Sequence, residues 1–316
     1  MRKIAASACL ALAAAAPFTS CLAVEGGVGR SFIGAQITPY IGIIPPEPGF
    51  QYSFNYVYLD GTIGGGKQVP IAGEVALNLE ATFDLYAAGL AYVWDTRPGR
   101  WNFASVVAIP FDQADATADL TVGESSVRVK DSDSGLFDMT FVPVVASYHV
   151  SEIEHWSFAM YISAPTGSYV EGQLANNSLN NWTFAPAVGY THLFQQGTLE
   201  FSALAGVDIF TKNNATDYQN GSVFRFDALL TKRLPNGWDF GVVGGLLYQI
   251  DDDTGPTADR LNGFKGHSFG IGPSIGYTHH FSKTSSISFL LRYIAAFDVK
   301  KELDGNPLLF TIAYSP

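Results

Sequence analysis

The stretch from Gly49 to Asp60, GFQYSFNYVYLD, carries an aromatic ring at every second position. Polar residues fill the places between the first four rings. Because successive side chains of a β-strand point to opposite faces, this spacing predicts a strand with all its rings on one face. The surface that covers those rings decides the class of protein. The rings belong to Phe50, Tyr52, Phe54, Tyr56 and Tyr58.

The composition favours lipid as that surface. Beyond the first two dozen residues no run of about 20 apolar residues could form a membrane-spanning helix. Yet 47% of the 316 residues are hydrophobic and 14% aromatic, and only 15% are charged, against roughly 25% in an average soluble domain. Apart from helices, only closed β-barrels satisfy every backbone group inside a bilayer. The sequence therefore predicts an all-β transmembrane barrel, with a large secreted β-sandwich as the alternative.

The first 23 residues have the layout of a secretory signal peptide. Two cations are followed by an apolar Ala/Leu run and then by small residues, and we expect cleavage after Ala23. An acylated Cys21 is the alternative interpretation, but Phe18 is a poor first residue for a lipoprotein box. Cys9 and Cys21 are the only cysteines, so cleavage after Ala23 leaves a mature chain without disulfides.

The charge balance excludes one class of partner. Without Arg2 and Lys3 the chain keeps 18 − 2 = 16 cations against 29 anions, a net charge of −13. An acidity of this size argues against nucleic-acid binding, which depends on neutralising phosphates with cations.

The connections between the predicted strands alternate in length. Five are short turns and six are longer polar loops, the pattern of a twelve-stranded up-and-down antiparallel barrel with both ends in the periplasm, short periplasmic turns and longer extracellular loops. A Greek-key sandwich gives no such alternation. The predicted strands cover 49–60, 75–95, 100–112, 135–150, 155–166, 181–194, 197–210, 222–233, 237–251, 266–281, 285–298 and 306–315.

Two segments depart from this simple pattern. In 75–95 the apolar residues move from odd to even positions, which predicts a β-bulge near Leu85–Tyr86. The stretches 118–122 and 126–130 also alternate, and we interpret them as a hairpin above the membrane. If they were membrane strands instead, the barrel would have fourteen strands.

Six ionisable residues fall inside predicted strands, on faces opposite apolar side chains. A charge that faces lipid is expensive, so these residues are predicted to face the lumen. Two roles remain open. They could form a polar constriction that selects solutes, or an internal salt-bridge network that braces and fills the barrel. The six are Glu200, Asp208, Arg225, Asp227, Asp239 and Arg292.

The segment 24–48, before the barrel proper (49–316), is too rich in glycine and proline for a helix. Its apolar residues, which include Phe32, Ile33, Ile37 and Ile41, would be costly to leave in water. We therefore expect this N-terminal periplasmic segment to dock in the barrel mouth as a partial plug.

Motifs for catalysis or metal binding are scarce. The adjacent His279 and His280 point to opposite faces of a strand and cannot bind one metal together. The acidic runs 131–135 and 251–255 lack the glutamate that an EF-hand carries at its twelfth position, although weak divalent bridging to lipopolysaccharide stays open. We expect no enzyme activity, no cofactor and no metal site.

Several stretches, taken in order, resemble a known family. They are Ile44–Gly49, Gly135–Asp138 with Pro143 and His149, the stretch 220–255, and Gly270–Pro273. Together they resemble the outer-membrane proteins named for the meta-pathway of phenol degradation. The resemblance implies an outer-membrane barrel that passes hydrophobic or aromatic small molecules, and it implies no catalytic residues. The chain departs in ending on Pro316, where many such barrels end on an aromatic residue.

These observations lead to one functional hypothesis and one alternative. The first is a channel in the bacterial cell outer membrane for passive uptake of small hydrophobic or aromatic compounds. The alternative is a non-transporting structural or adhesive barrel with a lumen plugged by side chains. The expected partners are outer-membrane lipid and lipopolysaccharide, a small apolar or aromatic solute and, during insertion, the barrel-assembly machinery.

Overall fold

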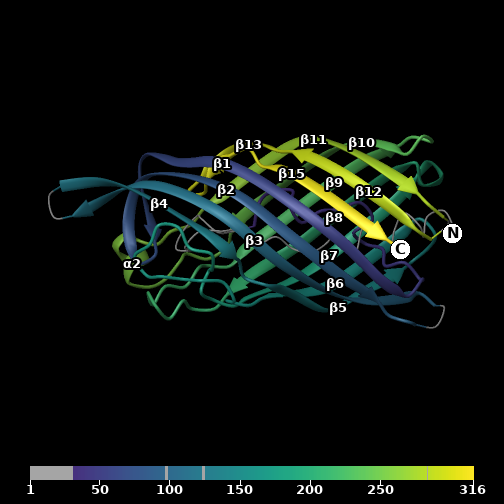
Figure 1. The fold of residues 1–316 in the computed structure, drawn as a ribbon, viewed down its shortest axis with the longest axis horizontal. Helices are drawn as coiled ribbons and strands as arrows, with labels where there is room; N and C mark the ends of the chain where they lie inside the picture. Colours follow the sequence, from purple (N-terminus) through teal and green to yellow (C-terminus); the bar gives the residue numbers. More distant parts are fainter. Residues whose placement is uncertain (1–30, 97–98, 123–124, 283) are drawn as a thin grey trace.

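Twelve antiparallel strands close into a barrel (Figure 1). The computed structural model describes residues 31–96, 99–122, 125–282 and 284–316; the predicted signal peptide and Cys21 lie outside them. Neighbours along the chain pair with each other, and β15 closes the ring by pairing with β1. The twelve-stranded up-and-down barrel is therefore confirmed. Its strands are β1 (Gly49–Ile71), β2 (Glu74–Val93), β3 (Trp101–Val122), β5 (Thr140–His149), β6 (Glu154–Ser163), β7 (Thr183–Phe194), β8 (Leu199–Phe210), β9 (Val223–Arg233), β10 (Trp238–Gln249), β11 (His267–His280), β12 (Ser286–Tyr293) and β15 (Leu308–Ser315).

Three further strands lie outside the ring. β4 (Ser125–Leu136) pairs with the far half of β3 to form a hairpin that projects beyond the barrel (Figure 1). This is the hairpin predicted above the membrane, and twelve rather than fourteen strands build the wall. β13 (Ala295–Lys300) pairs with β11, and β14 (Asp304–Gly305) pairs with β1.

Helical structure is minor in the described part of the chain. It consists of the short helix α2 (Pro256–Arg260) and the 3₁₀ turn η1 (Gln195–Gly197). Neither has the length and apolar character to cross a bilayer.

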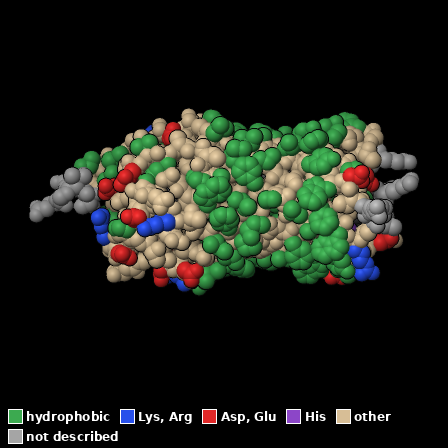
Figure 2. Space-filling model, turned by 90° about the horizontal axis from the view of Figure 1, so that it is seen from below, with side chains coloured by type: hydrophobic (Ala, Val, Ile, Leu, Met, Phe, Trp, Pro, Cys, Tyr) green, Lys and Arg blue, Asp and Glu red, His purple; other side chains and the backbone are tan. Residues whose placement is uncertain are grey.

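On the face shown in Figure 2, apolar side chains form a broad band across the middle of the barrel, and charged side chains gather towards its two ends. β1 shows how the alternation produces this band. The Phe50 side chain is 49% exposed, whereas Gln51 beside it is 2% exposed. The outer rings also contact each other between strands: the ring centroids of Phe50 and Tyr92 lie 4.9 Å apart. The rings of the first strand thus belong to the lipid-facing surface and fill no core.

The predicted β-bulge near Leu85–Tyr86 is wrong. Leu85 pairs with Val57 and Tyr86 with Tyr56 in unbroken register. The irregularity in the pairing of β2 with β3 lies between Leu77 and Glu80.

The apolar residues of β2 change position for another reason. From Leu79 to Leu85, the apolar residues of β2 face the packed interior. On the outward face, the residues from Glu80 to Asp84 are polar, and the apolar side chains begin at Tyr86. The change marks where the strand leaves the membrane. The inward residues of this part include Leu79, Ala81, Phe83 and Leu85.

Candidate functional site in the barrel lumen

The first described residues, 31–48, lie inside the barrel and are called the inner segment. Near the end of the barrel that carries the short turns, Asn102 Nδ2 donates a hydrogen bond to the Ile44 carbonyl (2.9 Å) and Ser157 Oγ donates to the Ile41 carbonyl (2.8 Å). Towards the long-loop end, Ser31 Oγ donates to Asp208 (3.2 Å). The inner segment therefore runs along much of the lumen. Residues 24–30 of the predicted periplasmic segment lie outside the described residues.

The inner segment also reaches across the lumen. The ring of Phe32 lies 6.2 Å from the ring of Phe83 on β2. Two residues later, Gly34 packs against Val243 on β10 and Ile294, so closely that a Cβ at Gly34 would lie 2.9 Å from the Ile294 side chain. In the strand order β2 and β10 stand on opposite sides of the ring. The chain itself obstructs the lumen at this level.

Three of the charged residues proposed from the sequence bind the backbone of the inner segment. Asp227 accepts a hydrogen bond from Gly34 N (2.8 Å), and Glu200 accepts one from Tyr40 N (2.5 Å). Arg292 Nη1 donates to the carbonyls of Gly34 (2.7 Å) and Ile37 (2.5 Å). Hydrogen bonds with a charged partner are stronger than neutral ones, so these contacts hold the segment at defined points.

A second pair of these residues joins two neighbouring strands. Arg225 Nε on β9 donates to Asp208 Oδ1 on β8 at 2.7 Å, and both side chains are buried. Arg225 also lies over the ring of Tyr161 on β6, 5.6 Å from its centroid. This contact braces the wall itself.

The remaining residue, Asp239, belongs to a cluster with an arginine that sequence reasoning missed. Arg233 forms an ion pair with Glu200 and lies 4.1 Å above the Tyr40 ring. Asp239 is the direct cross-strand neighbour of Arg233, and its Oδ1 has no hydrogen-bond partner among the described residues. In the sequence, Arg233 lies next to a turn, where an exposed cation is expected. However, Arg233 follows Arg225 by an even number of residues on the same strand, and this spacing indicates that both side chains face inward.

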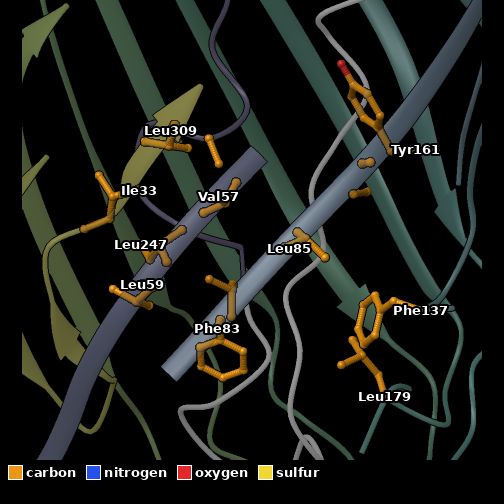
Figure 3. Close-up of a cluster of buried hydrophobic side chains, with 14 of the residues drawn as sticks. Ile33, Val57, Leu59, Phe83, Leu85, Phe137, Tyr161, Leu179, Leu247 and Leu309 are labelled. Atoms are coloured by element: carbon orange, nitrogen blue, oxygen red, sulfur yellow. The ribbon is translucent and has the colours of Figure 1, made fainter. Parts of the chain in front are cut away.

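A large apolar cluster occupies much of the long-loop half of the interior, beside the buried Arg225–Asp208 pair. Figure 3 shows side chains from several strands, from the inner segment and from connecting segments gathered in one buried cluster. The inward faces of β1 and β2 supply much of it. Members of the cluster include Ile33, Val57, Leu59, Phe83, Leu85, Phe137, Tyr161, Leu179, Leu247 and Leu309.

The loop 164–182 folds inward over this cluster and is held by Asp138. The Asp138 carboxylate accepts hydrogen bonds from Ser178 Oγ (2.7 Å), Leu179 N (2.8 Å) and Gly167 N (3.1 Å). Burial raises the pKa of Asp138 to about 6, against the opposing effect of these hydrogen bonds. Leu179 and its neighbours are buried as a result.

The two acidic runs also act as loop anchors. Asp253 accepts hydrogen bonds from Tyr218 Oη (2.5 Å), Gln249 Nε2 (2.6 Å) and Gly221 N (2.7 Å). Asp131 accepts one from Ala175 N (3.1 Å). Within the described ranges, no group of three or more histidine, cysteine or acidic side chains is arranged to hold a metal ion.

The closed barrel with its apolar outer band defines a transmembrane β-barrel protein. Residues 61–306 match the sequence model of the family described as "Putative MetA-pathway of phenol degradation". The chain belongs to this family. A comparison with curated proteins returns no match.

A solved structure shows the same fold at low sequence identity, and two others are more distantly similar. The COG4313 outer membrane channel from Pseudomonas putida F1 is 12% identical, with a TM-score of 0.66 over 89% of this chain and 100% of that one. A FadL homologue from Pseudomonas aeruginosa is 11% identical, with a TM-score of 0.47 over 95% and 99% of the two chains. The TodX deltaS2S3 mutant monoaromatic hydrocarbon channel is 9% identical, with a TM-score of 0.44 over 96% and 98%.

Proposed function

We propose that this protein is an outer-membrane channel for small apolar or aromatic compounds, closed in the present conformation by its inner segment. The apolar interior of the long-loop half carries the proposal (Figure 3). Barrels that pass hydrophilic solutes line the lumen with polar groups around water. A lining of leucine, valine and phenylalanine instead matches a solute that leaves water on entry.

Two comparisons support this function. The fold resembles that of an outer membrane channel over the full length of that structure. The family is described by a pathway of phenol degradation, which suggests an aromatic solute. We place the barrel in the outer membrane of a Gram-negative bacterium, with the short turns in the periplasm and the long loops outside.

The solute would enter between the long loops and pass the apolar cluster and the charged side chains of Arg225, Asp227, Arg292 and Glu200. The inner segment lies across this route, and much of its polar attachment consists of hydrogen bonds to wall side chains. Passage therefore requires the segment to shift.

A second function is favoured by the same closure. Because the inner segment fills the lumen and the loop 164–182 covers the other end, the protein could be a structural barrel that transports nothing. In that case displacing the segment would have no physiological counterpart.

Purified protein in liposomes distinguishes the two. We expect uptake of an aromatic tracer above that of empty vesicles, and a larger ion conductance after deletion of residues 31–47. The exposed substitution Lys130→Gln serves as the control, and different gel migration of unheated and boiled samples reports a folded barrel. If neither uptake nor conductance exceeds that of empty vesicles in either protein, the channel proposal fails and the structural barrel stands.

A further inference from the structure

Residues 41–44 of the inner segment rest on the inner faces of β5, β6 and β7 near the short turns. Ser147 Oγ donates to the Gly42 carbonyl (2.8 Å), and Gly42 N donates to Thr191 Oγ1 (2.9 Å). A Cβ at Gly42 would lie 2.7 Å from the His155 carbonyl oxygen. The segment therefore covers the backbone around His155 without a gap.

A chain of hydrogen bonds links this stretch to two histidines. Asn102 Nδ2 donates to the Ile44 carbonyl (2.9 Å) and lies 3.0 Å from His149 Nε2. His149 Nδ1 lies 2.8 Å from His155 Nδ1. The chain begins on the inner segment and ends on β6.

The donors in this chain fix the proton positions. The Asn102 amide has two hydrogens, so it can donate to both the Ile44 carbonyl and His149 Nε2. His149 then carries its own hydrogen on Nδ1 and donates it to His155 Nδ1. The neutral His155 must carry its hydrogen on its buried Nε2, and this ring also lies next to the Glu152 backbone. Only this arrangement makes every link.

The geometry of the pair fits a shared proton and not a metal ion. The two ring centroids are 5.0 Å apart and the two Nδ1 atoms 2.8 Å, a difference of 2.2 Å that is about the width of an imidazole ring. The Nδ1 atoms thus point straight at each other. A zinc ion at about 2.0–2.1 Å from each nitrogen needs them to lie farther apart.

We propose that Ile44, Asn102, His149 and His155 form a proton-sensitive anchor of the inner segment. An added proton binds His149 Nε2 and removes the lone pair that accepts the hydrogen bond from Asn102. The N–H groups of Asn102 and His149 then compete for the Ile44 carbonyl, which the His149 ring also faces. A second added proton leaves no lone pair between the two Nδ1 atoms. Each protonation step breaks a link of the chain.

Burial makes the charged pair unfavourable, because His155 is only 5% exposed. The titratable and charged groups around the pair are Glu152 and Glu154 beside the β5–β6 turn, His192 on β7, Arg100 before β3 and Glu47 on the inner segment. Among the described residues, neither histidine forms an ion pair with any of these carboxylates. A buried charge without a partner is relieved when water reaches it. Since residues 41–44 cover the pair, acid is expected to lift them from the wall.

A cysteine reporter tests the anchor. The variant Ile43→Cys is compared with Ser151→Cys in an exposed turn, and the ratio of their maleimide labelling rates cancels the effect of pH on the thiol itself. We expect the ratio to rise about tenfold between pH 7.5 and pH 4.5 as the segment opens locally. In the His149→Gln/His155→Gln background the ratio should stay constant, whereas the control His267→Gln/His279→Gln keeps the response.

A constant ratio in the parent protein, or an equal rise in the His149→Gln/His155→Gln background, overturns the anchor. A second reporter, Ala35→Cys, detects release through acidic residues that bind the segment elsewhere, such as Asp227 and Glu200. An equal response at both reporters that survives the double glutamine substitution assigns the effect to those carboxylates and also overturns the proposal. The inference rests on the proposed role of the inner segment as a seal, but labelling does not require transport. If the labelling test fails, the channel proposal is still tested by uptake. If uptake fails, the anchor is still tested by labelling.

Discussion

Arg225 Nε lies 2.7 Å from Asp208 Oδ1, and both side chains are almost completely buried between two neighbouring strands. Removing one partner of a buried pair leaves an uncompensated charge, which costs about 3–5 kcal/mol. We therefore expect Arg225→Met to lower the free energy of unfolding by this order. The measurement is denaturant unfolding of the barrel in detergent micelles.

The double variant Arg225→Met/Asp208→Leu removes both charges and is expected to recover much of that loss, because well-packed apolar side chains often replace a buried ion pair without cost. Ser31, which donates to Asp208, loses its acceptor in this variant, so recovery stays incomplete. Strictly additive effects of the two single substitutions would contradict a direct coupling.

Arg292 offers a direct test of the closure. Its guanidinium donates to the carbonyls of Gly34 and Ile37, so Arg292→Met removes two charge-assisted hydrogen bonds that hold the bend of the inner segment. Each such bond contributes about 1.5–3 kcal/mol, enough to raise the open population by one order of magnitude or more. We expect a larger single-channel conductance or a higher open probability in planar bilayers.

The matched control is Arg100→Gln, which removes a cation next to a short turn without touching the segment. If Arg292→Met conducts no more than this control, the inner segment is held by other contacts, such as Tyr40 with Glu200.

Asp138 predicts a pH dependence of stability. Burial raises its pKa from 3.8 to about 6 in the folded protein, so the folded state binds the proton more tightly than the unfolded state. The stabilisation from this group is fully present below pH 3.8 and is lost as the pH rises through 6. Between pH 4 and pH 7 the change amounts to up to about 3 kcal/mol, taking about 1.4 kcal/mol for each pH unit.

The variant Asp138→Asn cannot make this change. We expect the difference in unfolding free energy between the parent and Asp138→Asn to move in favour of the variant as the pH rises from 4 to 7. Protease cleavage within the loop 164–182 is a local measure of the same effect, because Asp138 holds both Gly167 and Leu179. A difference that does not vary with pH would refute the assignment.

The strands of the barrel could be predicted because their signals are local. A period of two identifies each strand, and turn residues separate them, so the alternation in β1 and the count of twelve needed no tertiary information. The error in β2 arose because alternation does not say which face is inside. The bulge near Leu85–Tyr86 was predicted because the apolar residues change position there, but Leu79 and Leu85 belong to an apolar cluster inside the barrel.

The partners inside the lumen could not be predicted for a different reason. The inward direction of Arg225 and Asp227 follows from strand alternation, but their partners depend on barrel register and on where the inner segment docks. Gly34 lies 193 residues before Asp227, the acceptor of its N–H. No short pattern encodes such a contact.

The apolar lining leads to a last prediction. Leu85 on β2 is buried in the interior cluster (Figure 3), so Leu85→Asn places an amide where an apolar solute would pass. A solute next to this amide leaves a polar group without its water, at a cost of about 1–3 kcal/mol. We expect uptake of an aromatic tracer to fall by about five- to a hundredfold, since 1.4 kcal/mol corresponds to one order of magnitude.

Ion conductance after deletion of 31–47 should stay nearly unchanged, because ions do not depend on apolar contact. Thr82→Asn, on the outward face of the same strand above the membrane band, is the matched control. Equal uptake by the two asparagine variants would show that the solute does not cross this cluster.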